Sequence, residues 1–277
     1  MKKNLKYYLK GKLSEKELQL VPSSFDVVGD ILIFSDFPKE LARKEKMIGE
    51  VILKTHAYIK TVLKKTRKYS GKFRTAKLKV IAGEEKKETI CRENNVLVKL
   101  DVEKVYFSVR MSSERLRISK LIKPNESVLV MFSGSAIYPL VIAKNLRCKE
   151  IYGIEINPVA YKYALENIKK NKLENKIKLF FGDVSKVLPR LNKIFDRILM
   201  PLPKGAENYL GLSLKHIKKN GIVHFYDFLH ENEFSKAHSK IGNACKIAGK
   251  KHKILNMVKC GQYAPGFYRI CVDFKVK

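Results

Sequence analysis

From residue 127 onward, short apolar segments alternate with segments that have the periodicity of a helix. We expect strands at 127–132, 150–155, 176–181, 196–200 and 221–228, and helices at 138–146, 158–171 and 205–218. Parallel strands need a long crossover, usually a helix, so this alternation predicts a mostly parallel sheet with helices on both faces. The last two extended segments, His252–Cys260 and Phe267–Val276, are joined by a short loop and should pair antiparallel.

Three of these strands end in residues that suit a nucleoside-containing cofactor. The first closes on Gly134, where a residue without a side chain lets the backbone approach a ligand closely. Glu155 ends the second strand, where a carboxylate can accept both hydroxyls of a ribose. Asp183 follows the third strand and could accept a hydrogen bond from an adenine amino group. These residues in this order are typical of a site for S-adenosylmethionine, which we expect as the cofactor.

The chain is strongly basic, with 57 Lys and Arg residues against 27 Asp and Glu residues and a formal charge of +30. Such a charge favours polyanions, because neutralised phosphates release their counterions. Heavy lysine usage across a genome would give a similar total, but here the charge is clustered. Ten basic and no acidic residues lie between Lys54 and Lys79, and eight basic and no acidic residues lie between Phe234 and Val272. The clustering favours RNA or DNA as a partner.

Other features of the composition predict neither a metal nor a membrane partner. The five cysteines are scattered, with no CxxC pair and no histidine at ligand spacing, so we expect buried thiols and no metal. His224 lies on an expected strand and is interpreted as a structural residue. No apolar stretch is long enough to span a bilayer, and the N-terminus lacks a signal-peptide core. We therefore expect a cytoplasmic protein. Separately, we expect it to be a monomer.

A smaller α/β unit is expected at residues 24–111, ahead of a cofactor-binding domain at 112–277. Its predicted elements are a strand pair at Phe25–Phe34, a helix at Glu40–Lys65, and strands at Leu78–Ile81 and Val96–Val102. A helix from about Ser112 to the residue before Pro124 should connect the two parts. Residues 1–23 form an N-terminal extension in this division.

Four segments carry a closer resemblance: Gly71–Thr75 (GKFRT), Tyr106–Arg115 (YFSVRMSSER), Met200–Lys204 (MPLPK) and Gln262–Pro265 (QYAP). With them the chain, from about residue 24 to its end, resembles the archaeal and eukaryotic family that modifies guanosine 37 of tRNA. This family includes the tRNA (guanine37-N1)-methyltransferases and the wyosine-pathway transferases. The resemblance implies tRNA, bound at its anticodon loop, as the partner. It also implies that the family's tRNA-elbow domain is absent or reduced to residues 1–23.

The same resemblance implies the fold of a class I, Rossmann-like methyltransferase. In this α/β fold a mostly parallel seven-stranded sheet ends in an antiparallel hairpin, and a smaller N-terminal α/β domain precedes it. The chemistry also restricts which residues can act. N1 of guanine carries a proton that must leave before methylation, and negative charge then develops on O6, so a base and a cationic donor are required. The resemblance assigns these roles to Glu114 and Arg74.

Each assignment has a plainer alternative. Glu114 could be a solvated helix carboxylate paired with a neighbouring arginine, and Arg74 could contact a phosphate. Tyr106 is placed against the target base, but it could equally be a core residue. By the resemblance, Pro201 and Pro203 also line the base site. The residues implied at the cofactor are Arg115, Phe132, Gly134, Glu155, Ile156, Asp183 and Val184.

Two positions depart from the family pattern. Val130 stands where an acidic residue normally precedes Met-Phe, and Pro201 stands where the N1-methyltransferases generally carry asparagine. Proline has no side-chain donor, and a less restrictive wall would tolerate a bulkier base. This resembles an archaeal branch that methylates both N1 of guanosine 37 and C7 of 4-demethylwyosine, giving isowyosine. Aminocarboxypropyl transfer from the same cofactor and a non-catalytic RNA-binding role are the alternatives. The retained Leu202–Lys204 segment favours methyl transfer.

Overall fold

The computed structural model describes residues 4–145, 148–202 and 204–277. The chain divides into two compact units, which we call the N-terminal unit (Met1–Arg92 with Leu97–Val109) and the C-terminal unit (Glu93–Val96 with Arg110–Lys277). In the part of the chain that the structure describes, no helix is long and apolar enough to cross a membrane.

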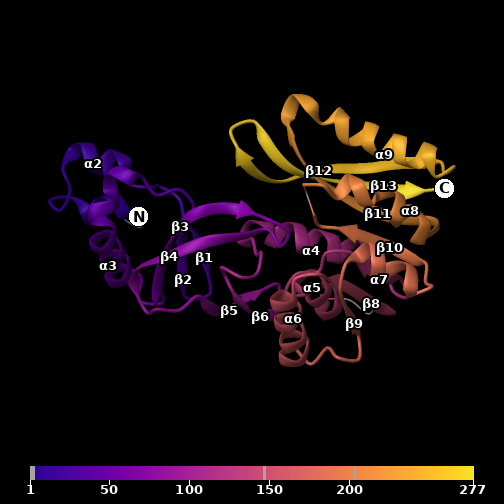
Figure 1. The fold of residues 1–277 in the computed structure, drawn as a ribbon, viewed down its shortest axis with the longest axis horizontal. Coiled ribbons are helices and arrows are strands. Elements are labelled where there is room, and N and C mark those ends of the chain that lie inside the picture. The colour runs from indigo at the N-terminus through magenta and orange to yellow at the C-terminus, as the bar shows by residue number, and fades with distance from the viewer. Residues whose placement is uncertain (1–3, 146–147, 203) are drawn as a thin grey trace. The chain divides into compact units, whose positions relative to one another are not determined.

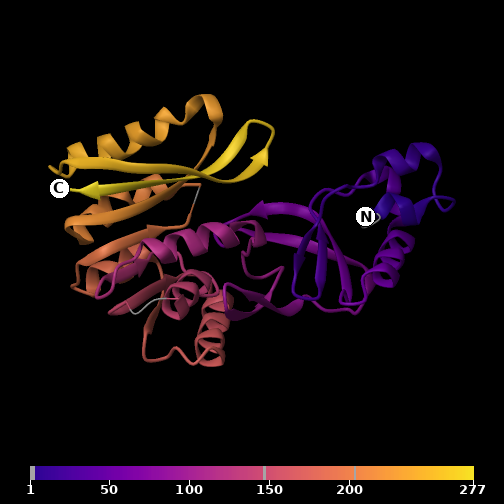
Figure 2. The same cartoon turned by 180° about the vertical axis from the view of Figure 1, so that it is seen from behind.

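The N-terminal unit is built on a four-stranded sheet in the order β1-β2-β3-β4. β1 and β2 pair antiparallel, β2 and β3 pair parallel, and β3 and β4 pair antiparallel. Helices α1, α2 and α3 share one hydrophobic core with this sheet, and Figure 2 shows them gathered in indigo. The bounds are α1 Leu5–Leu9, α2 Glu15–Leu20, β1 Asp26–Val28, β2 Ile31–Phe34, η1 Lys39–Lys44, α3 Glu45–Thr55, β3 Thr61–Ser70, β4 Thr75–Gly83, β5 Glu88–Glu93 and β6 Val96–Asp101.

The helix expected at Glu40–Lys65 is wrong in its last third. α3 ends at Thr55, and the chain enters β3 at Thr61. Val62 and Leu63 are both fully buried, so the strand is apolar on both faces where it begins. A strand buried on both faces shows no alternation and cannot be told from a buried helix by periodicity alone. The β-branched Thr61 and Val62 favour the extended form.

The C-terminal unit contains a seven-stranded sheet in the order β12-β13-β11-β10-β7-β8-β9, which Figure 1 shows as a series from yellow to salmon. All pairings from β11 to β9 are parallel, whereas β13 is antiparallel to both of its neighbours. The expected fold class is therefore confirmed. The bounds are η2 Val109–Met111, α4 Ser112–Leu121, β7 Ser127–Val130, α5 Ile137–Asn145, β8 Glu150–Glu155, α6 Pro158–Lys170, β9 Ile177–Phe181, α7 Val184–Arg190, β10 Phe195–Met200, η3 Ala206–Tyr209, α8 Leu210–His216, β11 Ile217–His230, η4 Glu231–Glu233, α9 Ser235–Ile247, β12 His252–Ala264 and β13 Phe267–Val276.

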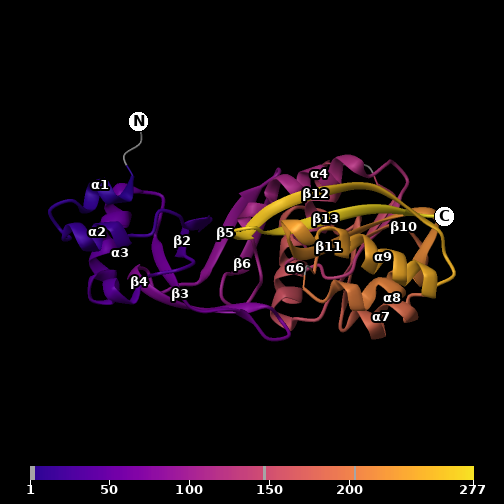
Figure 3. The ribbon, with the colours of Figure 1, turned by 90° about the horizontal axis from the view of Figure 1, so that it is seen from above.

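The two faces of this sheet are covered differently. Figure 3 shows α4 on one side and α7, α8 and α9 on the other. On the second side, alternate residues of β10, β11 and β13 pack with these helices into one apolar core. Met200, Phe225 and Val272 belong to this core and are fully buried. The face towards α4 is polar in the same three strands, and the proposed active site depends on that difference.

Candidate active site

Four of the predicted site residues follow the carboxyl ends of neighbouring parallel strands. Gly134 comes after β7, Glu155 ends β8, Asp183 follows β9 and Pro201 follows β10. These strands are adjacent in the sheet in the order β10-β7-β8-β9. The carboxyl edge of such a sheet is where open α/β folds bind ligands. The structure therefore brings these four residues to one edge, as their order in the sequence predicts.

Glu155 closes the turn after β7. The backbone N–H of Gly134 donates to Glu155 Oε2 at 2.6 Å, and the N–H of Asn157 donates to Glu155 Oε1 at 2.7 Å. Gly134 has a φ of +57°, in the left-handed region that a residue without a Cβ adopts at low cost. Burial raises the pKa of the Glu155 carboxyl, and hydrogen bonds from the backbone of Asn157, Gly134 and Ile156 oppose the rise.

This arrangement fits a ribose. A carboxylate offers more acceptor sites than the three backbone donors occupy, so Glu155 can still accept from a ribose hydroxyl. The backbone hydrogen bonds from Gly134, Asn157 and Ile156 fix the orientation of the carboxylate before any ligand arrives. The next residue, Ile156, is partly buried, and Asn157 caps α6 by accepting from the N–H groups of Val159 and Ala160.

Asp183 has a structural role in addition to the one predicted. It is the N-cap of α7, and its Oδ1 accepts from the Ser185 backbone N–H at 2.9 Å and from the Ser185 hydroxyl at 2.7 Å. Val184, the first residue of α7, is buried. The cap therefore fixes Asp183 at the carboxyl edge, beside the first turn of a helix.

An aromatic pair lies at the same edge. The rings of Phe132 and Tyr209 meet edge to face with centroids 5.1 Å apart. Burial and the negative charge of Asp183 raise the pKa of Tyr209, so this hydroxyl remains protonated. Phe132 is one of the predicted cofactor residues, whereas sequence reasoning missed Tyr209. An aromatic residue shortly after the MPLPK segment was the available signal.

Glu114 is buried in the C-terminal unit, with 4% of its surface exposed. Arg117 donates to it twice, from Nε to Oε2 at 2.7 Å and from Nη2 to Oε1 at 2.8 Å. The Tyr226 hydroxyl donates to Oε1 at 2.8 Å. Glu114 is thus paired with a neighbouring arginine, as the plainer alternative has it, but it is buried rather than solvated.

The position of Glu114 follows from the register of the sheet. Phe225 pairs with Met200, the last residue of β10, so Tyr226 lies level with the start of the MPLPK loop at Pro201. Because Tyr226 donates to Glu114, the carboxylate is held at the edge where β10 ends. Pro201 is partly buried, and Pro203 lies outside the described residues.

Arg115 makes a second buried ion pair. Its Nε and Nη2 donate to the two carboxylate oxygens of Glu93, each at 2.5 Å. Its guanidinium carbon also lies 6.0 Å from the centre of the Tyr138 ring. A bidentate pair fixes the side chain. The predicted cofactor contact of Arg115 must therefore be made while Glu93 holds its guanidinium.

The polar face under α4 continues beyond Glu114. Arg117 also donates from Nη1 to Asp273 Oδ2 at 2.7 Å, and Asp273 Oδ1 lies 2.5 Å from His224 Nδ1. Arg197 Nη1 lies 2.8 Å from His224 Nε2. Because arginine can only donate, Nε2 accepts and Nδ1 carries the proton given to Asp273. His224 is thus a buried, hydrogen-bonded residue, as predicted.

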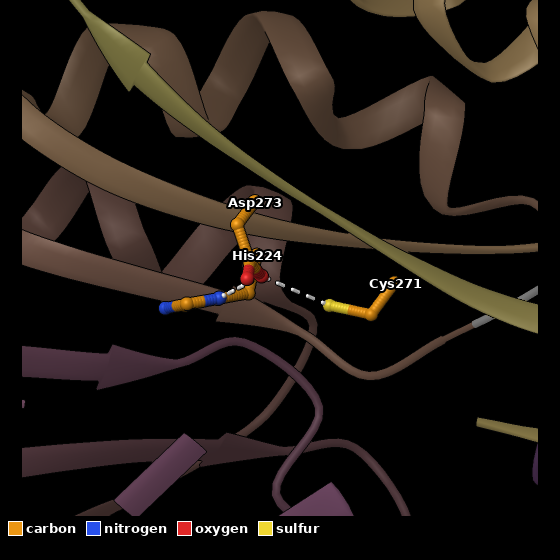
Figure 4. Close-up of side chains that lie close together, drawn as sticks. All are labelled: His224, Cys271 and Asp273. Carbon is orange, nitrogen blue, oxygen red and sulfur yellow. Dashed lines mark hydrogen bonds and ion pairs between the residues drawn. The ribbon is translucent and has the colours of Figure 1, made fainter. Parts of the chain in front are cut away.

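Figure 4 shows His224, Cys271 and Asp273 close together. The side-chain atoms that could coordinate a metal ion lie within 4.8 Å of one another. The chemistry of this cluster favours hydrogen bonding over metal binding. Burial raises the pKa of the Cys271 thiol well above its ordinary value, whereas a metal needs the thiolate. Both ring nitrogens of His224 are already engaged, one of them by the cationic Arg197.

The N-terminal unit holds the other predicted residues. Arg74 lies in the β3–β4 turn with a φ of +52°, and its N–H donates to the Gly71 carbonyl at 3.2 Å. A left-handed conformation is uncommon for a residue with a side chain. Tyr106 packs edge to face against Tyr69 of β3, with centroids 5.0 Å apart, and Lys65 Nζ lies 4.5 Å from the centre of the Tyr69 ring. These residues combine aromatic and cationic groups on one unit.

Comparison with known proteins shows which family the chain resembles. Residues 89–255 match the TRM5/TYW2 methyltransferase domain, and residues 5–86 match the TYW2 N-terminal domain. The tRNA (guanine(37)-N(1))-methyltransferase Trm5b of Pyrococcus abyssi is 38% identical over 93% of this chain and 76% of its own length. The tRNA (guanine(37)-N(1))/4-demethylwyosine(37)-methyltransferase Taw22 of Nanoarchaeum equitans is 33% identical over 90% of this chain and 98% of its own length.

A third relative has a different activity in its name, and solved structures share the fold. The tRNA(Phe) (4-demethylwyosine(37)-C(7)) aminocarboxypropyltransferase of Methanocaldococcus jannaschii is 32% identical over 91% of this chain and 97% of its own length. Trm5b of Pyrococcus abyssi superposes with a TM-score of 0.87 at 37% identity, over 96% of this chain and 78% of that chain. TYW2 of Pyrococcus horikoshii, solved with MeSAdo, superposes with a TM-score of 0.83 at 27% identity, over 98% of this chain and 97% of that chain. The chain belongs to the TRM5/TYW2 methyltransferase family.

Proposed function

We propose that the protein transfers a methyl group from S-adenosylmethionine to N1 of guanosine 37 in tRNA. The observation that carries the proposal is the buried carboxylate of Glu114, held at the end of β10 on the sheet edge that also presents Gly134, Glu155 and Asp183. A base at the cofactor-binding edge is what an N1-methylation requires, because guanine N1 becomes a good nucleophile only when its proton leaves.

The cofactor assignment rests on the turn after β7. Glu155 accepts the ribose hydroxyls while Gly134 and Asn157 hold its carboxylate in place. Asp183 is assigned to the adenine, and Phe132, Ile156 and Val184 to the walls of the cofactor site. Family members solved with related ligands support this choice, since TYW2 of Methanocaldococcus jannaschii was solved with AdoMet. When bound, the cofactor supplies an electrophilic methyl group on a positively charged sulfur.

In the proposed reaction Glu114 accepts the N1 proton and becomes a neutral carboxylic acid. The N1 lone pair forms a bond to the methyl carbon, the sulfur–methyl bond breaks, and its electrons neutralise the sulfonium. Charge that develops on O6 needs a donor, and we assign that role to Arg74. Tyr106 is assigned to the base. The conformation of Arg74, with its positive φ, is consistent with a functional residue in a turn.

We assign tRNA binding chiefly to residues 24–111 and cofactor binding to residues 112–277. The basic segment between Lys54 and Lys79 covers β3, the turn after it and the first half of β4. Phe73 in that turn is 41% exposed and offers an apolar ring beside basic side chains. Aromatic rings and cations together suit an RNA loop, whose bases stack and whose phosphates need neutralising. We also infer that the protein works in the cytoplasm as a monomer.

A second activity, methylation of C7 of 4-demethylwyosine, is proposed on account of Pro201. Proline offers no side-chain amide at the position where N1-specific relatives carry asparagine, so the pocket wall is less polar and can accept a tricyclic base. The similarity to Taw22, whose name includes both substrates, supports this. Substituting Pro201→Asn should favour guanosine over the wyosine precursor, because a buried amide left unpaired discriminates strongly.

Aminocarboxypropyl transfer is the second candidate. It is favoured by the match of residues 5–86 to the TYW2 N-terminal domain and by the similarity to aminocarboxypropyltransferases over almost their full length. The Leu202–Lys204 segment, typical of the methyl-transferring members, argues for methyl transfer. The transferred group separates the two candidates, because a methyl group and an aminocarboxypropyl group differ in mass.

The test uses Glu114→Gln, which keeps the shape of the side chain but cannot accept the proton. At saturating cofactor and tRNA, single-turnover N1-methylation should fall by on the order of 10²–10⁴ while both ligands still bind. A rate within a few-fold of the wild type would remove Glu114 as the base. Methylation of the precursor by the wild type, followed by nucleoside mass spectrometry, tests the second activity independently.

A further inference from the structure

The sheet face beneath α4 is unusually polar for strands that are buried on both faces. His224 and Tyr226 alternate on β11, and their partners in β13 are Asp273 and Cys271. All four are buried, at 4% exposure or less. Strands that are buried on both faces normally carry apolar residues on both. The opposite face of the same strands follows that rule, so the polar face is a local departure from it.

The polar groups of this face form one hydrogen-bonded chain. Tyr138 donates to Tyr226 at 3.0 Å, Tyr226 donates to Glu114, and Arg117 joins Glu114 to Asp273. From Asp273 the chain runs through His224 and Arg197 to Glu126, which accepts from Arg197 Nε at 2.7 Å. Arg117 is the link between the proposed base and the rest of this chain.

We propose that Arg117 is a positioning residue for Glu114, anchored by Asp273, which fixes the direction of the Glu114 carboxylate and supplies its counter-charge inside the protein. This inference rests on the proposed function, in which Glu114 accepts the N1 proton. Arg117 is suited to the role because its rigid guanidinium engages the two carboxylates at once. The hydrogen bonds to Asp273 keep the Arg117 guanidinium oriented towards Glu114.

The groups that face Glu114 leave its charge dependent on Arg117. Besides Arg117 they are Tyr138 of α5, Tyr226 of β11, Cys260 of β12 and Cys271 of β13. Burial is the leading cause that raises the pKa of each of these hydroxyls and thiols, so all four are neutral at physiological pH. A buried carboxylate without a cation tends to take up a proton.

Asp273 keeps this arrangement balanced during the reaction. When Glu114 accepts a proton it loses its charge, but Arg117 remains paired with Asp273. Against the effect of burial, hydrogen bonds from His224 and Arg117 lower the pKa of Asp273, so it stays ionised. No unpaired buried cation is therefore created in the step, which avoids the cost of an uncompensated charge.

The test compares Arg117→Met with Arg117→Lys. The methionine variant should lower the single-turnover methylation rate at neutral pH by on the order of 10²-fold, because a base displaced by about 1 Å costs that much. In the pH–rate profile of this variant, the fall in rate on the acidic side (the acidic limb) should begin at higher pH, because the Glu114 carboxylate then lacks its cationic partner. The lysine variant should restore the limb but only part of the rate, because an ammonium cannot span both carboxylates.

A double-mutant cycle separates a failure of this inference from a failure of the proposed function. If Arg117 acts through Glu114, then Arg117→Met should have little further effect in a Glu114→Gln background. Additive losses, or an acidic limb that does not move, would overturn the inference even if Glu114→Gln is inactive. A fully active Glu114→Gln would instead refute the proposed base.

Two controls keep the result interpretable. Lys120→Met removes an exposed cation from the same helix and should leave the pH profile unchanged. Cofactor affinity measured by calorimetry should change by less than about 3-fold in each Arg117 variant, a difference worth under ~1 kcal/mol. If Arg117→Met does not fold, the Arg117→Lys variant, which retains the charge, decides alone: a wild-type rate would overturn the inference.

Discussion

Replacing Arg197 by methionine removes a buried guanidinium on which the polar face of the sheet depends. Arg197 is 1% exposed and makes four hydrogen bonds: two to Glu126, one to the Leu121 carbonyl and one to His224. Methionine fills similar space but can donate to none of these acceptors. Removing one partner of a buried ion pair costs about 3–5 kcal/mol. Each kcal/mol of lost stability lowers the midpoint of thermal unfolding by about 2–4 °C, so this midpoint should fall by roughly 6–20 °C.

The assay is unfolding in urea and by heat, followed by near-ultraviolet circular dichroism of the tyrosines. Because the chain has two compact units, two transitions can occur, and only that of the C-terminal unit should move. Hydrogen exchange of the β10 and β11 amides identifies which of the two transitions belongs to the C-terminal unit. Lys218→Met is the matched control, because Lys218 pairs with Asp196 of β10 but its side chain is 42% exposed. That variant should lose at most about 1 kcal/mol.

A second substitution tests the physical cause. Adding Glu126→Gln to Arg197→Met should recover part of the lost stability, because it removes the carboxylate left without a partner. A loss of stability below about 1 kcal/mol for Arg197→Met, similar to that of Lys218→Met, would mean that the buried hydrogen-bonded chain contributes no more than a surface ion pair.

Titration, cofactor binding and RNA binding each depend on particular residues that can be tested separately. Burial lowers the pKa of His224, so the unfolded chain takes up a proton first as pH falls below about 6.5, and the free energy of unfolding should decrease there. Because the pKa of Asp273 is lowered, the free energy of unfolding should decrease further below about pH 3.9. Equal stability against urea at pH 7.5 and pH 5 would contradict the effect expected for His224. Glu155→Ala should weaken cofactor binding in calorimetry by at least ~10-fold, the result of losing bonds to a charged acceptor, with tRNA affinity unchanged, whereas the exposed Glu174→Ala should change neither. tRNA affinity should fall steeply with salt, and Lys72→Ala together with Lys77→Ala should flatten the logarithmic slope by about 0.7–0.9 for each phosphate that is no longer neutralised; an unchanged slope would place the RNA elsewhere.

The order of strands and helices in the C-terminal unit was predictable because parallel strands with helical crossovers impose a regular alternation. Gly134 and Glu155 could also be placed, since residues at the carboxyl ends of adjacent strands must meet at one edge. Helices α7 and α9 were missed. α7 is short and contains Pro189. In α9 the buried residues Ala237, Ile241 and Cys245 are spaced as in a helix, but two of them are small and they stand among serine, lysine and histidine, so the apolar stripe is narrow.

The buried polar chain could not be predicted from the sequence. Arg117, Arg197 and Asp273 lie far apart in the chain, and charged residues on a helix or strand usually face solvent. Only the strand register, in which His224 pairs with Asp273, brings them together under α4. The partners of Glu114 therefore required the structure, although Glu114 itself was recognisable within YFSVRMSSER.

Methyl transfer to N1 of guanosine 37 can be measured directly. The direct test incubates the purified protein with S-adenosylmethionine and an unmodified tRNA transcript that carries guanosine at position 37, then digests the tRNA and analyses its nucleosides by mass spectrometry. We predict 1-methylguanosine at position 37, and none when position 37 is changed to adenosine or when Glu114→Gln replaces the wild type. Unmodified guanosine at position 37, despite measured binding of both cofactor and tRNA, would contradict N1-methylation by this protein.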